Sequence, residues 1–137
     1  MTATSRGETE LHRLLAGLAP RLLPEAYIFY CLPCGVYGDG ADLAPLAAFR
    51  EEEGLTLVIP EEHAKRARIA YESVFRCITL TIHSSLDGIG LTAAVSTKLA
   101  EYGISVNVIA AVYHDHLLVP ADQAERALTA LAELSES

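Results

Sequence analysis

Basic residues are scarce in this chain of 137 residues. Ten lysines and arginines stand against 18 aspartates and glutamates, which gives a formal net charge of −8 at pH 7. Proteins that neutralise the phosphates of a nucleic acid carry a basic patch or stripe. Nothing in this sequence resembles such a stripe. The charge balance therefore predicts that nucleic acid is not a partner.

Long apolar runs are missing as well. None reaches the roughly 20 residues that a membrane-spanning helix needs, and the opening segment, MTATSRGETE, lacks the apolar core of a signal peptide. We therefore expect a cytoplasmic protein with no membrane partner. The three cysteines, Cys31, Cys34 and Cys77, cannot all pair within one chain, so reduced thiols are expected rather than disulfides.

Catalytic motifs are also lacking. The segment TIHSSLDG (81–88) places serines beside a histidine, but the chain has no G-x-S-x-G elbow. The segment YGDGADL (37–43) lacks the Gly-Lys-Ser/Thr ending of a phosphate-binding loop. We therefore expect neither an enzyme nor a bound cofactor.

Material for a core is plentiful, because 51% of the residues are hydrophobic and 20% are charged. In the second half, residues 73–82 read as a strand. Residues 88–102 read as an amphipathic helix with Leu91, Val95, Leu99 and Tyr102 on one face. Residues 104–113 and 116–120 read as a hairpin, and residues 121–134 as a terminal helix. The predicted order is β-α-β-β-α.

The first half follows the same order with one element missing. A helix is expected over 8–18, a strand over 26–32, two strands over 46–51 and 55–59, and a short helix over 61–70. Three glycines and two prolines make 33–45 a loop in the place of the first helix.

An internal repeat supports this parallel. Residues 55–67 match residues 115–127 at an offset of 60, including a proline at the junction of strand and helix. The matching pairs are Leu57 with Leu117, Ile59 with Val119, Pro60 with Pro120, Ala64 with Ala124, Arg66 with Arg126 and Ala67 with Ala127.

We therefore predict an α+β fold of two ferredoxin-like βαββα modules, each an antiparallel sheet with helices on one face. Residues 1–70 would form an abbreviated N-terminal module preceded by a helix. Residues 71–137 would form a complete C-terminal module. Pairing of modules through open edges or faces predicts a homodimer.

Two segments carry a resemblance to a known family. The stretch SSLDGIGLTAAVSTKLAEYGISVNVIAAVYHDHLLVP (84–120), together with REEEGLTLV (50–58), resembles the ACT domain, and more closely small bacterial proteins made of two ACT-like repeats. The resemblance implies a regulatory module that binds an amino acid or similar small ligand between two modules. No catalytic domain is recognisable in the chain, so the regulated protein is unknown.

The loop 84–92 is the first candidate ligand site. Gly88 and Gly90 open the helix, so amides with no partner inside the helix face outward, where a carboxylate would bind. Asp87 could cap these amides or bind a ligand ammonium. The structural alternative is equally simple: the glycines allow close packing of helix on sheet, and Asp87 is an ordinary N-cap.

Two further segments complete the predicted pocket. The resemblance implies polar ligand contacts from the strand around Asn107. If the modules are quasi-equivalent, the turn after Arg50 approaches the second module's loop, and the Arg50 fork could bind a carboxylate; otherwise this acidic turn is a solvated one. The predicted ligand-binding residues are Ser85, Leu86, Asp87, Gly88, Ile89, Gly90, Leu91, Thr92, Asn107, Val108, Ile109, Arg50, Glu52, Glu53 and Leu55.

Two alternatives remain open. Cys31-x-x-Cys34 and His114-x-His116 could together hold a metal ion or support redox chemistry. The histidines could equally form the polar tip of a hairpin, with no metal bound. A module that only dimerises and binds no ligand is the other alternative.

Overall fold

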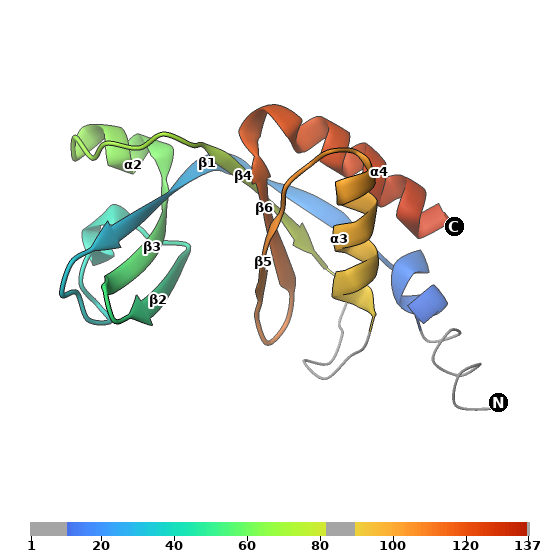
Figure 1. Cartoon of the computed structure of the whole chain (residues 1–137), viewed down its shortest axis with the longest axis horizontal. Helices are drawn as coiled ribbons and strands as arrows, with labels where there is room; N and C mark the ends of the chain where they lie inside the picture. The colour runs from blue at the N-terminus through green and yellow to red at the C-terminus, as the bar shows by residue number, and fades with distance from the viewer. Residues whose placement is uncertain (1–10, 82–89, 137) are drawn as a thin grey trace. The chain divides into compact units, whose positions relative to one another are not determined.

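The computed structural model describes residues 11–81 and 90–136. Residues 11–16 are helical. The elements that follow are β1 (Pro20–Leu32), the 3-10 turn η1 (Ala41–Leu43), β2 (Ala47–Glu51), β3 (Gly54–Pro60), α2 (Glu61–Arg66), β4 (Phe75–Leu80), α3 (Leu91–Glu101), β5 (Asn107–Ala110), β6 (Asp115–Pro120), the 3-10 turn η2 (Ala121–Gln123) and α4 (Ala124–Glu136) (Figure 1).

The chain divides into two compact units. The inserted unit is Pro24–Phe75, and the terminal unit combines Met1–Leu23 with Arg76–Ser137. Strand β1 begins in the terminal unit and ends in the inserted unit. These two units are defined by which residues pack together. The boundary between residues 70 and 71 was instead predicted from the internal repeat, and it stays a prediction.

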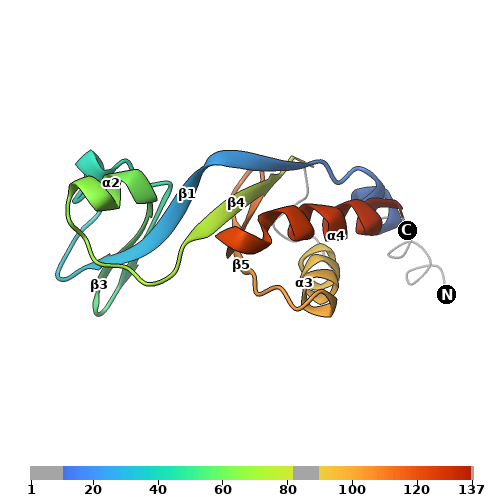
Figure 2. The ribbon, with the colours of Figure 1, turned by 90° about the horizontal axis from the view of Figure 1, so that it is seen from above.

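The terminal unit contains a complete module in the order β4-α3-β5-β6-α4. Its strands lie in the order β1-β4-β6-β5, and β5 pairs antiparallel with β6. Helices α3 and α4 lie on the same side of these strands (Figure 2). The opposite side, here called the helix-free face, carries the alternate side chains of each strand. It is formed by Cys77, Thr79, Asn107, Ile109, His116 and Leu118.

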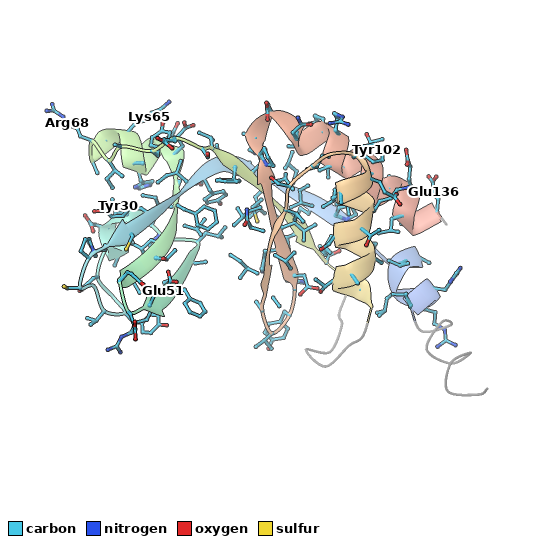
Figure 3. The ribbon with its side chains drawn as sticks, viewed as in Figure 1. Tyr30, Glu51, Lys65, Arg68, Tyr102 and Glu136 are labelled. Carbon is cyan, nitrogen blue, oxygen red and sulfur yellow. The ribbon has the colours of Figure 1, made fainter. Side chains whose placement is uncertain are left out.

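The inserted unit repeats this order in shorter form, as β1-η1-β2-β3-α2. Its strands lie in the order β2-β3-β1, all antiparallel. Alternate residues of β1 and β3 pack beneath α2 around Leu57, which is 1% exposed. Glu51 lies at the end of β2 (Figure 3). Its carboxylate accepts a hydrogen bond of 2.6 Å from the Thr56 hydroxyl.

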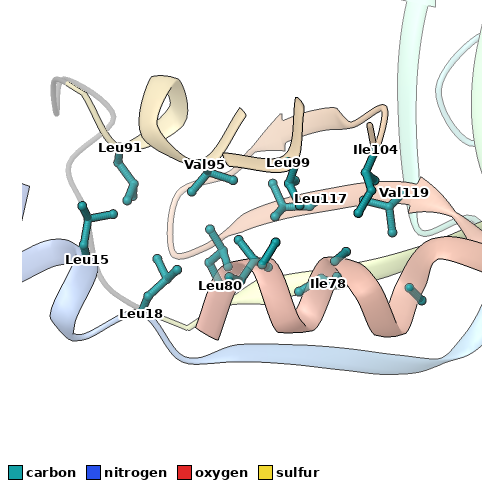
Figure 4. Packing of buried hydrophobic residues seen from close by; sticks show 14 residues of the cluster. Leu15, Leu18, Ile78, Leu80, Leu91, Val95, Leu99, Ile104, Leu117 and Val119 are labelled. Atoms are coloured by element: carbon teal, nitrogen blue, oxygen red, sulfur yellow. The ribbon is translucent and has the colours of Figure 1, made fainter. Parts of the chain in front are cut away.

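The core of the terminal unit consists of side chains at helical spacing on its helices and at every second position of its strands. Leu91, Val95 and Leu99 form the buried stripe of α3, as predicted, and meet alternate residues of β4 and β6 (Figure 4). Tyr102 ties α3 to α4, because its hydroxyl donates a hydrogen bond to Glu133. The hydrogen bond from Tyr102 lowers the pKa of Glu133 below its usual value, and a hydrogen bond from the Lys98 ammonium lowers it further by a smaller amount.

The predicted α+β fold is confirmed, and some element ends differ. Strand β1 starts at Pro20 rather than at residue 26. The first part of β1 was not predicted because it contains Pro20 and Pro24, and proline cannot donate a hydrogen bond to a neighbouring strand. Helix α2 ends at Arg66 rather than at residue 70, because Arg68 adopts a positive φ of 58° that ends a helix. Residues 8–10 of the predicted first helix lie outside the described residues.

Candidate functional site

Helix α3 begins directly after Gly90, one of the two glycines predicted to open it. Gly90 has a φ of 97° and serves as the N-cap without a side-chain hydrogen bond. The first amides of a helix have no carbonyl partner within the helix and carry a partial positive charge. Thr92 is exposed, whereas the Leu91 side chain is 5% exposed and lies in the core, so Leu91 offers a ligand its backbone only.

The loop before this helix carries five of the predicted ligand-binding residues. Ser85, Leu86, Asp87, Gly88 and Ile89 lie outside the described residues. The roles of Asp87 as a cap or as an ammonium ligand therefore stay predictions.

Strand β5 divides the next three predicted residues between its two faces. Val108 packs against the helix-side core. Asn107 is exposed and Ile109 is half-buried, and both belong to the helix-free face, where Ile109 lies opposite His116. Val108 and Ile109 are both half-buried but on opposite faces of the strand, and Asn107 is the exposed member of the three.

Strands β4 and β6 add polar groups to this face that the sequence analysis did not include. Thr79 Oγ1 lies 2.9 Å from Nδ1 of His116, and 4.0 Å from the Cys77 sulfur. Burial raises the pKa of the Cys77 thiol, and burial also lowers the pKa of His116. The alternation of β6 would have revealed this position, since His116 and Leu118 flank the core residue Leu117.

The remaining predicted residues belong to the inserted unit. Glu52 and Glu53 form the exposed two-residue loop between β2 and β3, and Arg50 is exposed on β2. The Arg50 amide donates a hydrogen bond of 3.2 Å to the Tyr37 hydroxyl. Leu55 is 0% exposed and forms part of the core. That these residues and the α3 terminus close one pocket stays a prediction.

The hollows on the described surface include one in each unit. One, of about 520 Å³, follows the outer side of α3 from Gly90 to Glu101, between Leu11 and Leu134. The other, of about 300 Å³, lies in the inserted unit, and Glu25, Glu61 and Glu62 are among the residues that line it. Only the first adjoins a predicted site residue, because Gly90 lines its end.

The proposed metal ligands separate into two pairs. Cys31 and Cys34 are exposed in the inserted unit, while His114 and His116 belong to the terminal unit. Within residues 11–81 and 90–136, no three histidine, cysteine or acidic side chains are placed to hold a metal ion. His114 lies in the hairpin loop as predicted, whereas His116 lies in β6.

Comparison with protein families decides the relationship. Profiles of the ACT domain match the chain twice, over residues 6–76 and over residues 72–133. The chain belongs to the ACT-domain family. The two matches confirm the tandem arrangement of ACT modules that the internal repeat suggested.

Solved structures share the fold of this ACT-domain protein. A Vibrio cholerae protein of unknown function, described as a possible transport protein, is 47% identical, with a TM-score of 0.81 over 91% of this chain and 95% of that one. A protein from Agrobacterium tumefaciens is 20% identical, with a TM-score of 0.67 and coverage of 86% and 89%.

A third structure is the ligand-free regulatory subunit of aspartate kinase from Thermus thermophilus. It is 12% identical, with a TM-score of 0.61 over 84% of this chain and 95% of that one. At such identities the second and third structures establish the shared fold alone. No curated protein matches the chain. Among the helices that the structure describes, none combines the length and hydropathy needed to cross a bilayer.

Proposed function

We propose that this ACT-domain protein is a non-enzymatic regulatory module that binds a small molecule, an amino acid in the first instance. The observation that carries the proposal is the N-terminus of α3, where Gly90 leaves the first helical amides without a side-chain cap of its own. Membership of the ACT family supports a ligand at such a place. The fold shared with an aspartate kinase regulatory subunit, named as a ligand-free form, is consistent with it.

The chemistry of an amino acid suits the predicted residues. Its carboxylate would accept hydrogen bonds from the amides of Leu91 and Thr92, where the helix dipole favours negative charge. Its ammonium would bind Asp87. Asn107, exposed on β5, would hydrogen-bond the ligand through its amide. Glu52, Glu53 and Arg50 would contribute from the β2–β3 turn of a second module.

The regulatory action would be a shift between two arrangements of the modules. A ligand that touches two modules stabilises the arrangement it binds more tightly, and only by its differential affinity. A partner protein would then recognise that arrangement. We propose that the protein acts in the cytoplasm as a homodimer, without a metal ion or a cofactor.

A panel of the twenty amino acids in a thermal-unfolding assay tests the proposal. A ligand that binds only the folded chain, at about 100 times its dissociation constant, adds about 2.7 kcal/mol of stability and raises the melting temperature. Asn107→Ala should remove most of this shift. Ser105→Ala is the matched control, because Ser105 is also exposed and lies just before β5.

Each contrary result identifies a different alternative. If no amino acid stabilises the chain, the module that only dimerises gains support. Stoichiometric zinc in the purified protein would favour the metal-binding alternative instead. If Asn107→Ala and Asp87→Ala both keep the full shift, a ligand binds but the proposed site is wrong.

A further inference from the structure

The two modules share a strand register at the offset of the internal repeat. Asn107 lies opposite Leu118 at the start of β5, and Ala47 lies opposite Val58 at the start of β2. Each residue of the second pair precedes its counterpart by 60 residues, as in the repeat. The position of Asn107, the strand residue proposed to hydrogen-bond the ligand, is therefore occupied by alanine in the inserted unit. A methyl side chain can neither donate nor accept a hydrogen bond.

The first helix of the terminal module also has a different counterpart in the inserted unit. Helix α3 packs on the hydrophobic cluster that contains Leu117. In the inserted unit, the loop 33–45 packs on the cluster that contains Leu57. Leu43 contacts that cluster, and a β-carbon added to Gly40 would lie 2.6 Å from Cδ1 of Leu57. The loop thus takes over part of the packing role of a helix.

This loop closes its own polar groups. The Val36 amide donates a hydrogen bond of 2.9 Å to the Asp39 carboxylate, and the Asp39 amide donates one of 2.9 Å to the Val36 carbonyl. The 3-10 turn that follows, Ala41–Leu43, has three residues, too few to sum peptide dipoles as a longer helix does. Asp39 therefore supplies, from within the loop, the carboxylate that a ligand would bring to α3.

Helix α3 keeps amides of the kind that the loop uses internally. Gly90 has no side chain with which to cap the helix. The Ala94 amide is the first to reach a carbonyl within it, that of Gly90 at 2.9 Å. The amides of residues 91–93 therefore have no carbonyl partner inside α3.

We propose that each chain binds one small molecule, at the α3 terminus of the terminal unit, and that the inserted unit is a module with its own site closed. The internal repeat alone would predict two molecules per chain, one for each module. Asp39 and Ala47 argue against the second, since Asp39 occupies a loop amide and Ala47 removes the polar strand contact. This single site rests on the proposed function, because its occupant is the same ligand.

Isothermal titration calorimetry of the full chain measures the number of sites directly. The probe is the amino acid that gives the largest thermal shift in the panel of twenty. We expect one molecule bound per chain. Two molecules per chain, or one shared by two chains, would overturn the single site and leave the proposed function intact. If none of the twenty amino acids binds, the proposed function and the single site are both wrong.

Amide NMR signals locate the same amino acid without any substitution. Saturable shifts are expected for Leu91 and Thr92 and not for Val36 or Asp39. Saturable shifts of Val36 and Asp39 would show that the loop of the inserted unit binds the ligand, which contradicts a closed site.

A matched pair of variants tests the two equivalent strand positions. Asn107→Ala should weaken binding by up to about tenfold, the effect of losing one hydrogen bond. Ala47→Ser, a small change at the counterpart position, should leave the affinity unchanged. Equal weakening by both variants would show that the strand of the inserted unit also contacts the ligand, and the proposal would be wrong.

Discussion

At the scale of single residues, the backbone of Gly54 constrains the inserted unit most sharply. It begins β3 with a φ of 148°. A β-carbon built there would lie 2.5 Å from the carbonyl oxygen of Leu32 and 3.0 Å from Cα of Pro33, both backbone atoms. Such a contact cannot be relieved by turning a side chain. The close approach of β3 to the end of β1 therefore requires glycine.

Gly54→Ala should consequently destabilise the protein more than a positive φ alone explains. Strain at such a position costs on the order of 1–3 kcal/mol, and the clash adds to it. Gly38→Ala is the matched control, because Gly38 also has a positive φ, of 101°, with no atom within 4 Å of the added carbon. Urea unfolding of both variants measures the difference; equal losses would show that the clash contributes nothing.

Three residues of the candidate site, Gly90, Leu55 and Leu91, allow the sequence predictions to be compared with the structure. Gly90 does precede the first residue of α3, as predicted, and the structure adds that its φ is positive. Leu55 and Leu91 were predicted as ligand contacts, but both side chains are buried. The helical spacing of Leu91, Val95 and Leu99 already indicated the burial of Leu91. The burial of Leu55 was decided by packing.

At the scale of elements, the internal repeat places the same residues in the same roles. Leu57 lies in β3 and Leu117 in β6. Each is 1% exposed, and each strand ends at a proline that is followed by a helix. The two leucines belong to separate hydrophobic clusters. The sequence match at an offset of 60 thus corresponds to structural equivalence.

Truncating these leucines measures that equivalence. Leu57→Ala and Leu117→Ala should each cost about 2–5 kcal/mol of unfolding free energy, the range for removing a buried leucine side chain. Val112→Ala is the control, since Val112 is 71% exposed and should stay within about 0.5 kcal/mol of wild type. A loss near zero for either leucine, measured by chemical denaturation, would contradict its assignment to the core.

At the scale of the whole molecule, the inserted unit leaves apolar side chains uncovered. Phe49 on the edge strand β2 is 67% exposed, and Phe29 on β1 is 39% exposed and packs edge-to-face on Phe75. Exposed edges and aromatic patches are features that proteins commonly cover by association. They support the predicted homodimer.

Light scattering of the purified protein should therefore give twice the chain mass of 14.7 kDa. Phe49→Ser should shift the mass toward that of one chain if this face forms the contact. Val36→Ser is a suitable control, since Val36 is 49% exposed in the loop after β1. A wild-type mass of 14.7 kDa at high micromolar concentration would contradict the dimer itself.

The sequence by itself determined the order of strands and helices, the buried stripe of α3, the repeat and the family. These features depend on local periodicity, because a period of two or of 3.6 records which side of an element is buried. Tertiary structure decided what no period records: the extension of β1 through its prolines, the neighbours of His116, and the assignment of the cysteine and histidine pairs to different units. Partners across a sheet are distant in the chain, so packing alone selects them.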